Sequence, residues 1–209
     1  MKVIALNGSP HRSGNTAYAL NVVGKVLRGE GIDFEIVEIG GTQIRGCLAC
    51  GQCAKRQDGK CSTTSDLVND TLLKMKEADG ILIASPVYYS GIAGTMKCFL
   101  DRAFYVASAN GGWFRHKVGA SVVAVRRSGG SMTFDSLNHY LSLSEMLVPT
   151  ANYWNIIHGR AAGEASQDAE GNQVMEVLGS NMAWLLRMRE QGHNTEPHAV
   201  EKVFTNFVR

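Results

Sequence analysis

The sequence predicts an α/β domain built around a doubly wound parallel sheet of five strands, in the order 2-1-3-4-5, with helices on both faces. Short apolar segments alternate along the chain with stretches whose apolar residues recur at helical spacing. One of these segments, residues 80–85, forms a continuous apolar run, as expected of a strand that is covered on both faces. Right-handed crossovers then make the doubly wound order the simplest arrangement.

Each expected element follows from a local pattern. The first strand begins directly after Met1 and Lys2, and a loop rich in glycine and hydroxyl residues separates it from the first helix. A cysteine-bearing loop, residues 44–62, follows the second strand, and we expect Ser65 to cap the helix after it. A polar, glycine-containing connection, residues 159–171, precedes the last helix. The expected strands are residues 3–6, 33–39, 80–85, 117–125 and 148–157. The expected helices are residues 17–27, 65–78, 93–106, 132–146 and 172–191.

Length and composition fit one main domain. The chain has 209 residues, of which 44% are hydrophobic, and this is enough for a full core. We expect a domain over residues 1–191 and an extension, residues 192–209, that is a candidate for an arm packing on a neighbouring subunit. The net charge of +2 gives no electrostatic reason to expect a nucleic acid as main partner. No apolar run is long enough for a membrane, and the first strand leaves no room for a signal peptide, so we expect a cytoplasmic protein.

The loop of residues 7–16 has the composition of a phosphate site. It lies between a strand and a helix, and the free N–H groups and partial positive charge of a helix N-terminus favour an anion. It has neither the Gly-Lys-Ser/Thr ending of a nucleoside-triphosphate loop nor the spacing of a dinucleotide-binding turn, so a terminal monophosphate fits best. The alternative is a plain helix start capped by Ser13 or Asn15. The candidate phosphate donors are Ser9, Arg12, Ser13, Asn15 and Thr16.

Two further loops leave strands at the same edge of the predicted sheet. Residues 85–91 offer flat aromatic surfaces and backbone hydrogen-bonding groups for a planar heterocycle, and residues 126–131 offer glycines for a close approach and arginines for negative charge. Tyrosines that pack on the next helix and ordinary surface arginines are the alternatives. Together the three loops are typical of a flavin mononucleotide (FMN) site. The candidate ring-binding residues are Pro86, Val87, Tyr88, Tyr89, Arg127 and Gly129.

Four of the five cysteines lie within fifteen residues, in the pattern C-x2-C-x2-C-x7-C. Such crowding indicates metal or redox chemistry rather than a secreted disulfide framework. Close thiolates on one loop can enclose an iron–sulfur cluster, which needs four ligands. Free or redox-active thiols and a closed zinc site are the alternatives. The candidate ligands are Cys47, Cys50, Cys53 and Cys61.

Over roughly residues 1–155 the chain resembles the NADPH-dependent FMN reductase family of flavodoxin-like proteins, including its iron–sulfur flavoprotein branch. The resemblance is carried by Gly8-Ser9-Pro10 with Gly14-Asn15-Thr16, by Ala78-Asp79-Gly80, by Ser85-Pro86-Val87-Tyr88, and by Lys97 with Phe99-Leu100-Asp101-Arg102. It implies a flavodoxin-like fold, FMN bound by the three loops, and a homodimer or homotetramer with flavins near subunit interfaces. The iron–sulfur branch carries a [4Fe-4S] cluster beside FMN. Similar cysteine runs followed by Gly-Lys-Cys also occur in family members that hold no cluster, and Gly59-Lys60-Cys61 resembles those.

The leading functional prediction is an FMN-dependent oxidoreductase that passes electrons from NAD(P)H to a small-molecule acceptor such as a flavin or quinone. The flavin supplies the chemistry, so we nominate no catalytic side chain. The alternative is an iron–sulfur flavoprotein or flavodoxin-like electron carrier that exchanges electrons with protein partners. A third interpretation is a flavin-binding redox sensor whose cysteines are the output.

Overall fold

A computed structural model of the chain describes residues 1–205 and Phe207. Its five parallel strands have the order β2-β1-β3-β5-β6, so the predicted order is confirmed, and a sixth strand, β4, pairs antiparallel with β3. The strands are β1 (Lys2–Asn7), β2 (Asp33–Glu38), β3 (Gly80–Tyr88), β4 (Gly91–Ile92), β5 (Val118–Val125) and β6 (Ile156–His158). The helices are α1 (Asn15–Gly29), α2 (Gln52–Arg56), α3 (Val68–Glu77), α4 (Gly94–Ala109), α5 (Gly130–Leu143) and α6 (Ala169–Gly192), with short 3-10 turns η1 (Glu164–Gln167) and η2 (His193–Thr195).

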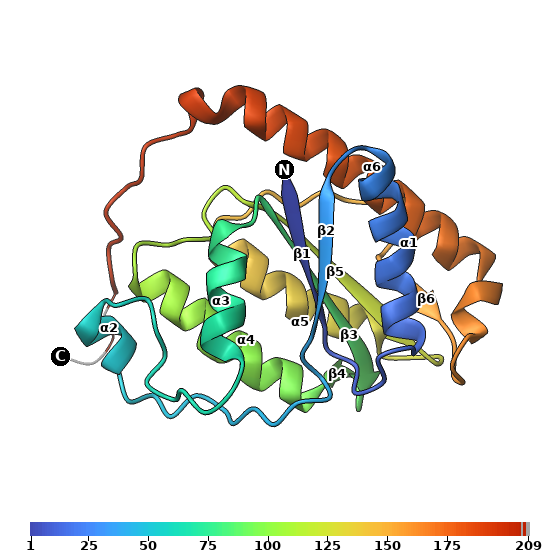
Figure 1. Ribbon diagram of the computed structural model, residues 1–209, viewed down its shortest axis with the longest axis horizontal. Helices are drawn as coiled ribbons and strands as arrows, with labels where there is room; N and C mark the ends of the chain where they lie inside the picture. The colour runs from blue at the N-terminus through green and yellow to red at the C-terminus, as the bar shows by residue number, and fades with distance from the viewer. Residues whose placement is uncertain (206, 208–209) are drawn as a thin grey trace.

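Helices cover both faces of the sheet, because the central strands are apolar on both sides. In β1, Val3 and Ala5 belong to the core under α1 and α6, whereas Ile4 and Leu6 belong to the core under α3, α4 and α5. Figure 1 shows α1 and α6 together on one side of the strands and α3 and α4 on the other. The parallel ladder brings the carboxyl ends of β1, β3 and β5 to one edge. In such a sheet, ligands bind at this edge.

The last predicted strand is mostly wrong. Residues 156–158 pair with β5 as a strand and Leu147 adds one isolated bridge to Val118, whereas a continuous strand was expected over residues 148–157. Pro149 has no N–H to donate to a ladder. Near the end of the segment, the buried side chain of Asn155 donates to the carbonyl of Ser121 at 3.0 Å, where a continued ladder would use backbone groups. The segment therefore follows the sheet edge as an irregular chain.

Local structure also differs from expectation at three helices or turns. The cysteine-bearing loop contains the short helix α2, and α3 begins at Val68 after Leu67, so Ser65 is not its cap.

After β3 the chain reverses through Tyr89 and Ser90, whose φ angles are +49° and +59°. Two consecutive positive φ angles are the signature of a tight two-residue hairpin. This hairpin forms β4 and sets the position of the aromatic loop.

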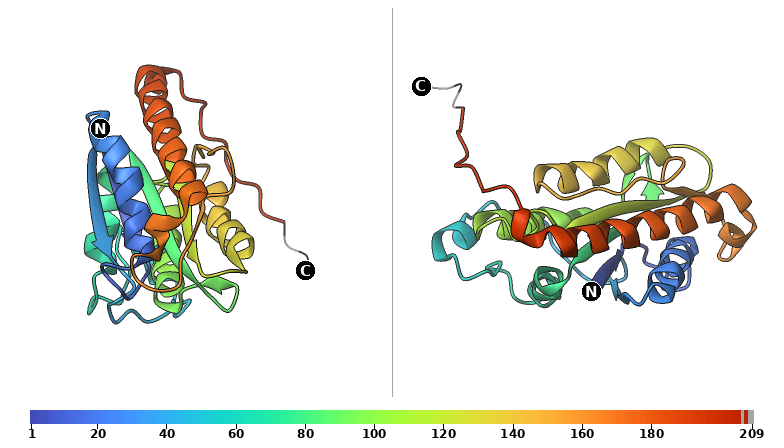
Figure 2. Two further views of the ribbon diagram at one scale, coloured as in Figure 1. Left: turned by 90° about the vertical axis from the view of Figure 1, so that its right-hand side faces the viewer. Right: turned by 90° about the horizontal axis from the view of Figure 1, so that it is seen from above.

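The segment after α6 leaves the helical layer in an extended form, as both views in Figure 2 show. The guanidinium of Arg115 donates to the carbonyls of Pro197 and His198 at 2.9 and 3.3 Å. Val200, Val203 and Phe204 beyond this contact are more than four-fifths exposed. An arm on a neighbouring subunit remains a prediction for residues 192–209, of which 206, 208 and 209 lie outside the described residues. Within the described chain, no helix is both long and apolar enough to cross a membrane.

Candidate functional site

A hollow of about 440 Å³ opens at the carboxyl ends of β1, β3 and β5. Its volume lies within the range of small-molecule sites. Parts of the chain that are far apart in sequence form it: the loop before α1, the end of β3, the end of β5 and the loop after β6. The lining residues are Ser9, His11, Ser13, Gly14, Asn15, Thr16, Pro86, Val87, Tyr88, Ala124, Arg126, Gly159, Arg160 and Ala162.

The loop before α1 is held in place by its own short hydrogen bonds. The amide of Ser9 donates to Asn7 Oδ1 at 3.1 Å, and Ser9 Oγ accepts from the amide of His11 at 3.1 Å. Gly14 stands at the N-cap of α1 without a side-chain hydrogen bond, so neither Ser13 nor Asn15 caps this helix. The N–H groups of the first helical turn therefore have no side-chain cap and lie at the hollow, where an anion can accept from them.

Glycine at position 40 lets the chain after β2 lie directly against this loop. A Cβ atom built at Gly40 would lie 2.2 Å from the carbonyl oxygen of Gly8, which is far inside contact distance. At the neighbouring Gly41 the nearest atom would be the carbonyl oxygen of Pro10 at 3.5 Å, an ordinary contact. The position of the loop before α1 thus depends on Gly40 and not on Gly41.

Asn15 has a task that the sequence did not indicate. Its side-chain amide donates to the carbonyl of Ala161 at 3.0 Å, and its Oδ1 accepts from the amide of Ala165 at 3.2 Å. Both ends of the amide thus tie α1 to the loop after β6. Asn15 lines the hollow, but in this structure it holds the loop of residues 159–165 against the helix instead of offering a free donor.

The positive charges at the hollow come from arginines outside the candidate list, although the loop of residues 126–131 was expected to supply arginines. Arg126 and Arg160 line it together with His11, whereas the nominated Arg12 is exposed and outside the lining. Glu164 lies close to Arg160, whose backbone N–H donates to its carboxylate at 2.6 Å. This bond and the one from the N–H of Ala161 lower the pKa of Glu164. Arg126 could have been named from the sequence, because it lies next to Arg127 in a loop expected at this edge. No pattern in the sequence indicates that Arg160 lies here.

The nominated ring-binding residues are divided between two hollows. Pro86, Val87 and Tyr88 line the first hollow, whereas Tyr89 is fully exposed at the tip of the hairpin. Arg127 and Gly129 line a neighbouring hollow, whose other walls include Tyr153, Trp154 and His158.

The two ring loops nevertheless touch. A Cβ built at Gly129, which has a φ of +86°, would lie 2.8 Å from the Cα of Ser90. The glycine therefore permits a close approach of the loop after β5 to the hairpin, and side chains from both loops border the same edge of the sheet.

The residues of the first hollow fit FMN. The buried hydroxyl residues Ser9 and Thr16, an uncapped helix start and two arginines are suitable partners for a terminal phosphate. Tyr88, which lines the hollow and is about half exposed, presents an aromatic surface suited to a planar ring. Of the residues nominated from sequence, Ser9, Ser13, Asn15, Thr16, Pro86, Val87 and Tyr88 lie together here, and Arg12, Tyr89, Arg127 and Gly129 do not.

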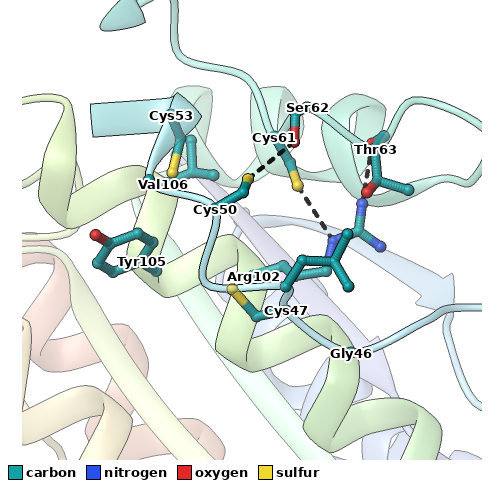
Figure 3. Close-up of a pocket in the computed structure, with 12 residues that line it drawn as sticks. Gly46, Cys47, Cys50, Cys53, Cys61, Ser62, Thr63, Arg102, Tyr105 and Val106 are labelled. Atoms are coloured by element: carbon teal, nitrogen blue, oxygen red, sulfur yellow. Dashed lines mark hydrogen bonds between the residues drawn. The ribbon is translucent and has the colours of Figure 1, made fainter. Parts of the chain in front are cut away.

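All four clustered cysteines line a separate hollow beside α4, away from the two hollows described above (Figure 3). Cys47 and Cys50 are exposed, Cys61 is partly buried, and Cys53 is buried in α2. Cys50 Sγ and Ser62 Oγ share a hydrogen bond of 3.3 Å, and Arg102 Nε donates to Cys61 Sγ at 3.3 Å. The sequence segment thus brings four thiols to one place, and the helix behind them supplies a cation.

The two central thiols differ in their electrostatic surroundings. The hydrogen bond with Ser62, the N–H of Gln52 and the nearby Arg56 lower the pKa of the Cys50 thiol. Burial raises the pKa of the Cys53 thiol. Among the described residues, no three His, Cys, Asp or Glu side chains are arranged to hold a metal ion. Four cysteine thiols on one segment are a ligand set that a [4Fe-4S] cluster or a structural zinc ion can use.

Comparisons with known proteins relate the chain to a family described by its use of FMN. The sequence model of the family described as NADPH-dependent FMN reductase matches residues 1–161. An iron-sulfur flavoprotein of Methanocaldococcus jannaschii is 32% identical over 195 residues, which cover 90% of this chain and 98% of the relative. An iron-sulfur flavoprotein of Archaeoglobus fulgidus is 33% identical over 153 residues, or 72% of this chain and 73% of the relative. A flavodoxin from the domain Archaea shares the fold with a TM-score of 0.60 at 18% identity, covering 90% of this chain and 99% of that chain.

Proposed function

This chain belongs to the NADPH-dependent FMN reductase family, and we propose that it passes electrons from NAD(P)H through bound FMN to a small-molecule acceptor such as a flavin or quinone. For each acceptor reduced by two electrons and two protons, one NAD(P)H and one proton are consumed and one NAD(P)⁺ is released. We further propose that the protein works as a homodimer or homotetramer, which light scattering on purified protein tests.

One observation carries the proposal: hydroxyl residues, a helix start, two arginines and an aromatic loop meet in one hollow. Bound FMN would supply the redox chemistry by accepting electrons from NAD(P)H and giving them to the acceptor. Ser9, Ser13 and Thr16 would hold the phosphate, and Arg126 and Arg160 would balance its charge. Pro86, Val87 and Tyr88 would border the ring and fix its orientation.

The side chains in this account bind and orient, and no residue has to move a proton. The position of Arg160 depends on Asn15, because this side chain fastens both Ala161 and Ala165. Tyr88 lines the hollow and is about half exposed, so a ring bound beside it would be accessible to a nicotinamide and then to an acceptor in turn. Because the nicotinamide and the acceptor would occupy the same position in turn, a separate acceptor pocket is not required.

Two measurements test the proposal. Heat-released flavin from the purified protein is identified by mass spectrometry, and FMN is the expected species, because the phosphate loop suits a monophosphate and lacks a dinucleotide fingerprint. Oxidation of NADH and of NADPH is then followed with riboflavin or a quinone as acceptor, with the FMN-free protein as the matched control. FAD as the dominant flavin, or equal oxidation rates with and without FMN, would contradict the proposal.

A second candidate function has its own observation. The four clustered cysteines line one hollow, and curated relatives are named iron-sulfur flavoproteins. We propose that Cys47, Cys50, Cys53 and Cys61 hold a [4Fe-4S] cluster, which would exchange single electrons. Anaerobically purified protein should then contain close to four iron and four acid-labile sulfide per chain, with broad absorption near 400 nm. Protein that contains FMN but no iron would leave a plain flavin reductase with structural or redox-active thiols.

A further inference from the structure

Arg102 of α4 is one of the most buried side chains in the molecule, with 1% of its surface exposed. A guanidinium carries five N–H bonds and has to donate them when it is removed from water. Five hydrogen bonds are formed here, by Nε to Cys61 Sγ, by one terminal nitrogen to the carbonyl of Arg45 and to Asp66, and by the other to the carbonyl of Thr63 and to Asp66. The donor capacity of Arg102 is therefore fully used.

The partners of Arg102 lie on both sides of the clustered cysteines. Arg45 precedes Cys47 by two residues, and Thr63 follows Cys61 by two. Asp66 is itself buried, and it receives both terminal nitrogens of the guanidinium. One side chain on a core helix thus fastens the beginning and the end of the segment of residues 46–62.

Arg102 also donates a hydrogen bond to the sulfur of one of the four cysteines, Cys61. Cys61 Sγ accepts the Nε–H bond at 3.3 Å, and the backbone of Cys61 is fixed by Asn69, whose side chain pairs with both its N–H and its carbonyl at 2.8 and 3.1 Å. Cys50 instead meets the neutral hydroxyl of Ser62, and Cys47 Sγ accepts from the backbone N–H of Ala49 at 3.4 Å. Among the described residues, Cys61 is the cysteine whose sulfur accepts from a cationic side chain. Figure 3 shows this bond at the rim of the hollow.

We propose that Arg102 is a positioning residue that closes the cysteine segment, aims Cys61 Sγ into the hollow and raises the reduction potential of a cluster held there. The part concerning potential rests on the proposed cluster, whereas the closure of the segment does not. One electron, which bound FMN reduced with NAD(P)H would supply, would add one negative charge to a cluster held by these cysteines and to its ligand sulfurs. A cationic N–H donor at one sulfur stabilises that added charge, and no bond or proton at Arg102 changes.

The closure is tested in the metal-free protein by hydrogen exchange measured with mass spectrometry. Arg102→Lys keeps the charge but loses the planar fork, and we expect amides of residues 46–62 to exchange at least about tenfold faster, because their local opening becomes easier. Arg45→Ala is the matched control, since Arg45 contributes only its carbonyl to the clamp, and its exchange should equal that of the wild type. FMN binding at the other hollow confirms that each variant is folded. Unchanged exchange in Arg102→Lys would overturn the closure, whether or not the protein holds iron.

The effect on potential is tested by redox titration of the iron-loaded protein. The midpoint potential of the cluster should be more negative in Arg102→Gln than in the wild type and unchanged in Arg45→Ala. If Arg102→Gln does not fold, as judged by FMN binding, Arg102→Lys replaces it, because its shorter reach removes the Nε–H bond to sulfur. An unchanged potential in an iron-loaded Arg102 variant would overturn the tuning role. Wild-type protein without iron would overturn both the cluster and this tuning role, and the exchange experiment would still decide the closure.

Discussion

The hollow at the carboxyl edge of the sheet, which we propose binds FMN (the FMN hollow), and the hollow lined by the four clustered cysteines (the cysteine hollow) are built in opposite ways. Four separate parts of the chain form the first, and the parallel sheet brings them together at its carboxyl edge. One continuous segment, residues 46–63, supplies most of the second, and α4 supplies the rest. The positions of the first set are consequences of topology and close backbone packing, as at Gly40. The second set is fastened by side-chain hydrogen bonds, among them those of the buried Arg102 and of Asn69. Damage to either hollow should therefore leave the other intact.

The largest expected effect is a complete loss of the cluster with no change in FMN binding. Cys50→Ser should abolish cluster absorption and remove the bound iron, because losing one of four ligands leaves an iron site open. The affinity for FMN should stay unchanged, since no cysteine lines that hollow. Cys98→Ser, on α4 but outside the cysteine hollow, is the matched control and should keep its iron. Loss of FMN in Cys50→Ser would show that the two hollows are not independent.

A second large effect is expected from adding one methyl group at the phosphate loop. Gly40→Ala places a Cβ against the backbone of Gly8, so the free energy of unfolding should fall by about 3 kcal/mol, the upper end for overpacking. A displaced loop should also weaken FMN binding by more than about 100-fold. Thermal unfolding and fluorescence titration measure the two quantities. Gly41→Ala should match the wild type in both, and equal effects of the two substitutions would contradict the packing argument.

Replacing Arg126, which lines the FMN hollow, and Arg12, which does not, gives a sharper test of this hollow. Arg126→Ala removes a cation from the lining, and the loss of a charge-assisted hydrogen bond of about 1.5–3 kcal/mol should weaken FMN binding about tenfold or more. Arg12→Ala should change FMN affinity little, because Arg12 is outside the lining. Isothermal titration with FMN and with riboflavin distinguishes a phosphate contact from a ring contact. If Arg12→Ala is the more damaging substitution, the loop rearranges when it binds its ligand.

The smallest expected effect concerns the aromatic loop. Tyr88→Ala removes an aromatic surface, and contacts of this kind contribute about 0.5–1.5 kcal/mol, so FMN affinity should fall about two- to tenfold. Tyr88→Phe should be close to the wild type if the ring face matters. Tyr89→Ala is the neighbouring control, because Tyr89 is fully exposed on the hairpin tip. A Phe variant as weak as the Ala variant would mean that the hydroxyl carries the interaction.

Much of this architecture was predictable because it has local causes. Strand and helix alternate with characteristic periodicities, and five strands in that alternation lead to the order found in the structure. The clustering of the four cysteines in one hollow follows from their closeness in sequence. Prediction failed where a distant contact decides the outcome. The strand expected from residue 148 onward begins only at Ile156, and Asn155 bonds to β5 through its side chain.

By itself the sequence determined the class of fold, the loops that reach the carboxyl edge and the segment that carries the thiols, because each depends on residues close together in the chain. Only the tertiary structure decided that Arg126 and Arg160, rather than Arg12 and Arg127, line the FMN hollow. It also decided that Asn15 fastens the loop after β6 and that Arg102 fastens the cysteine segment. These roles join residues between 36 and 150 positions apart. Side-chain directions at such separations are set by packing in three dimensions, and no local pattern in the sequence records them.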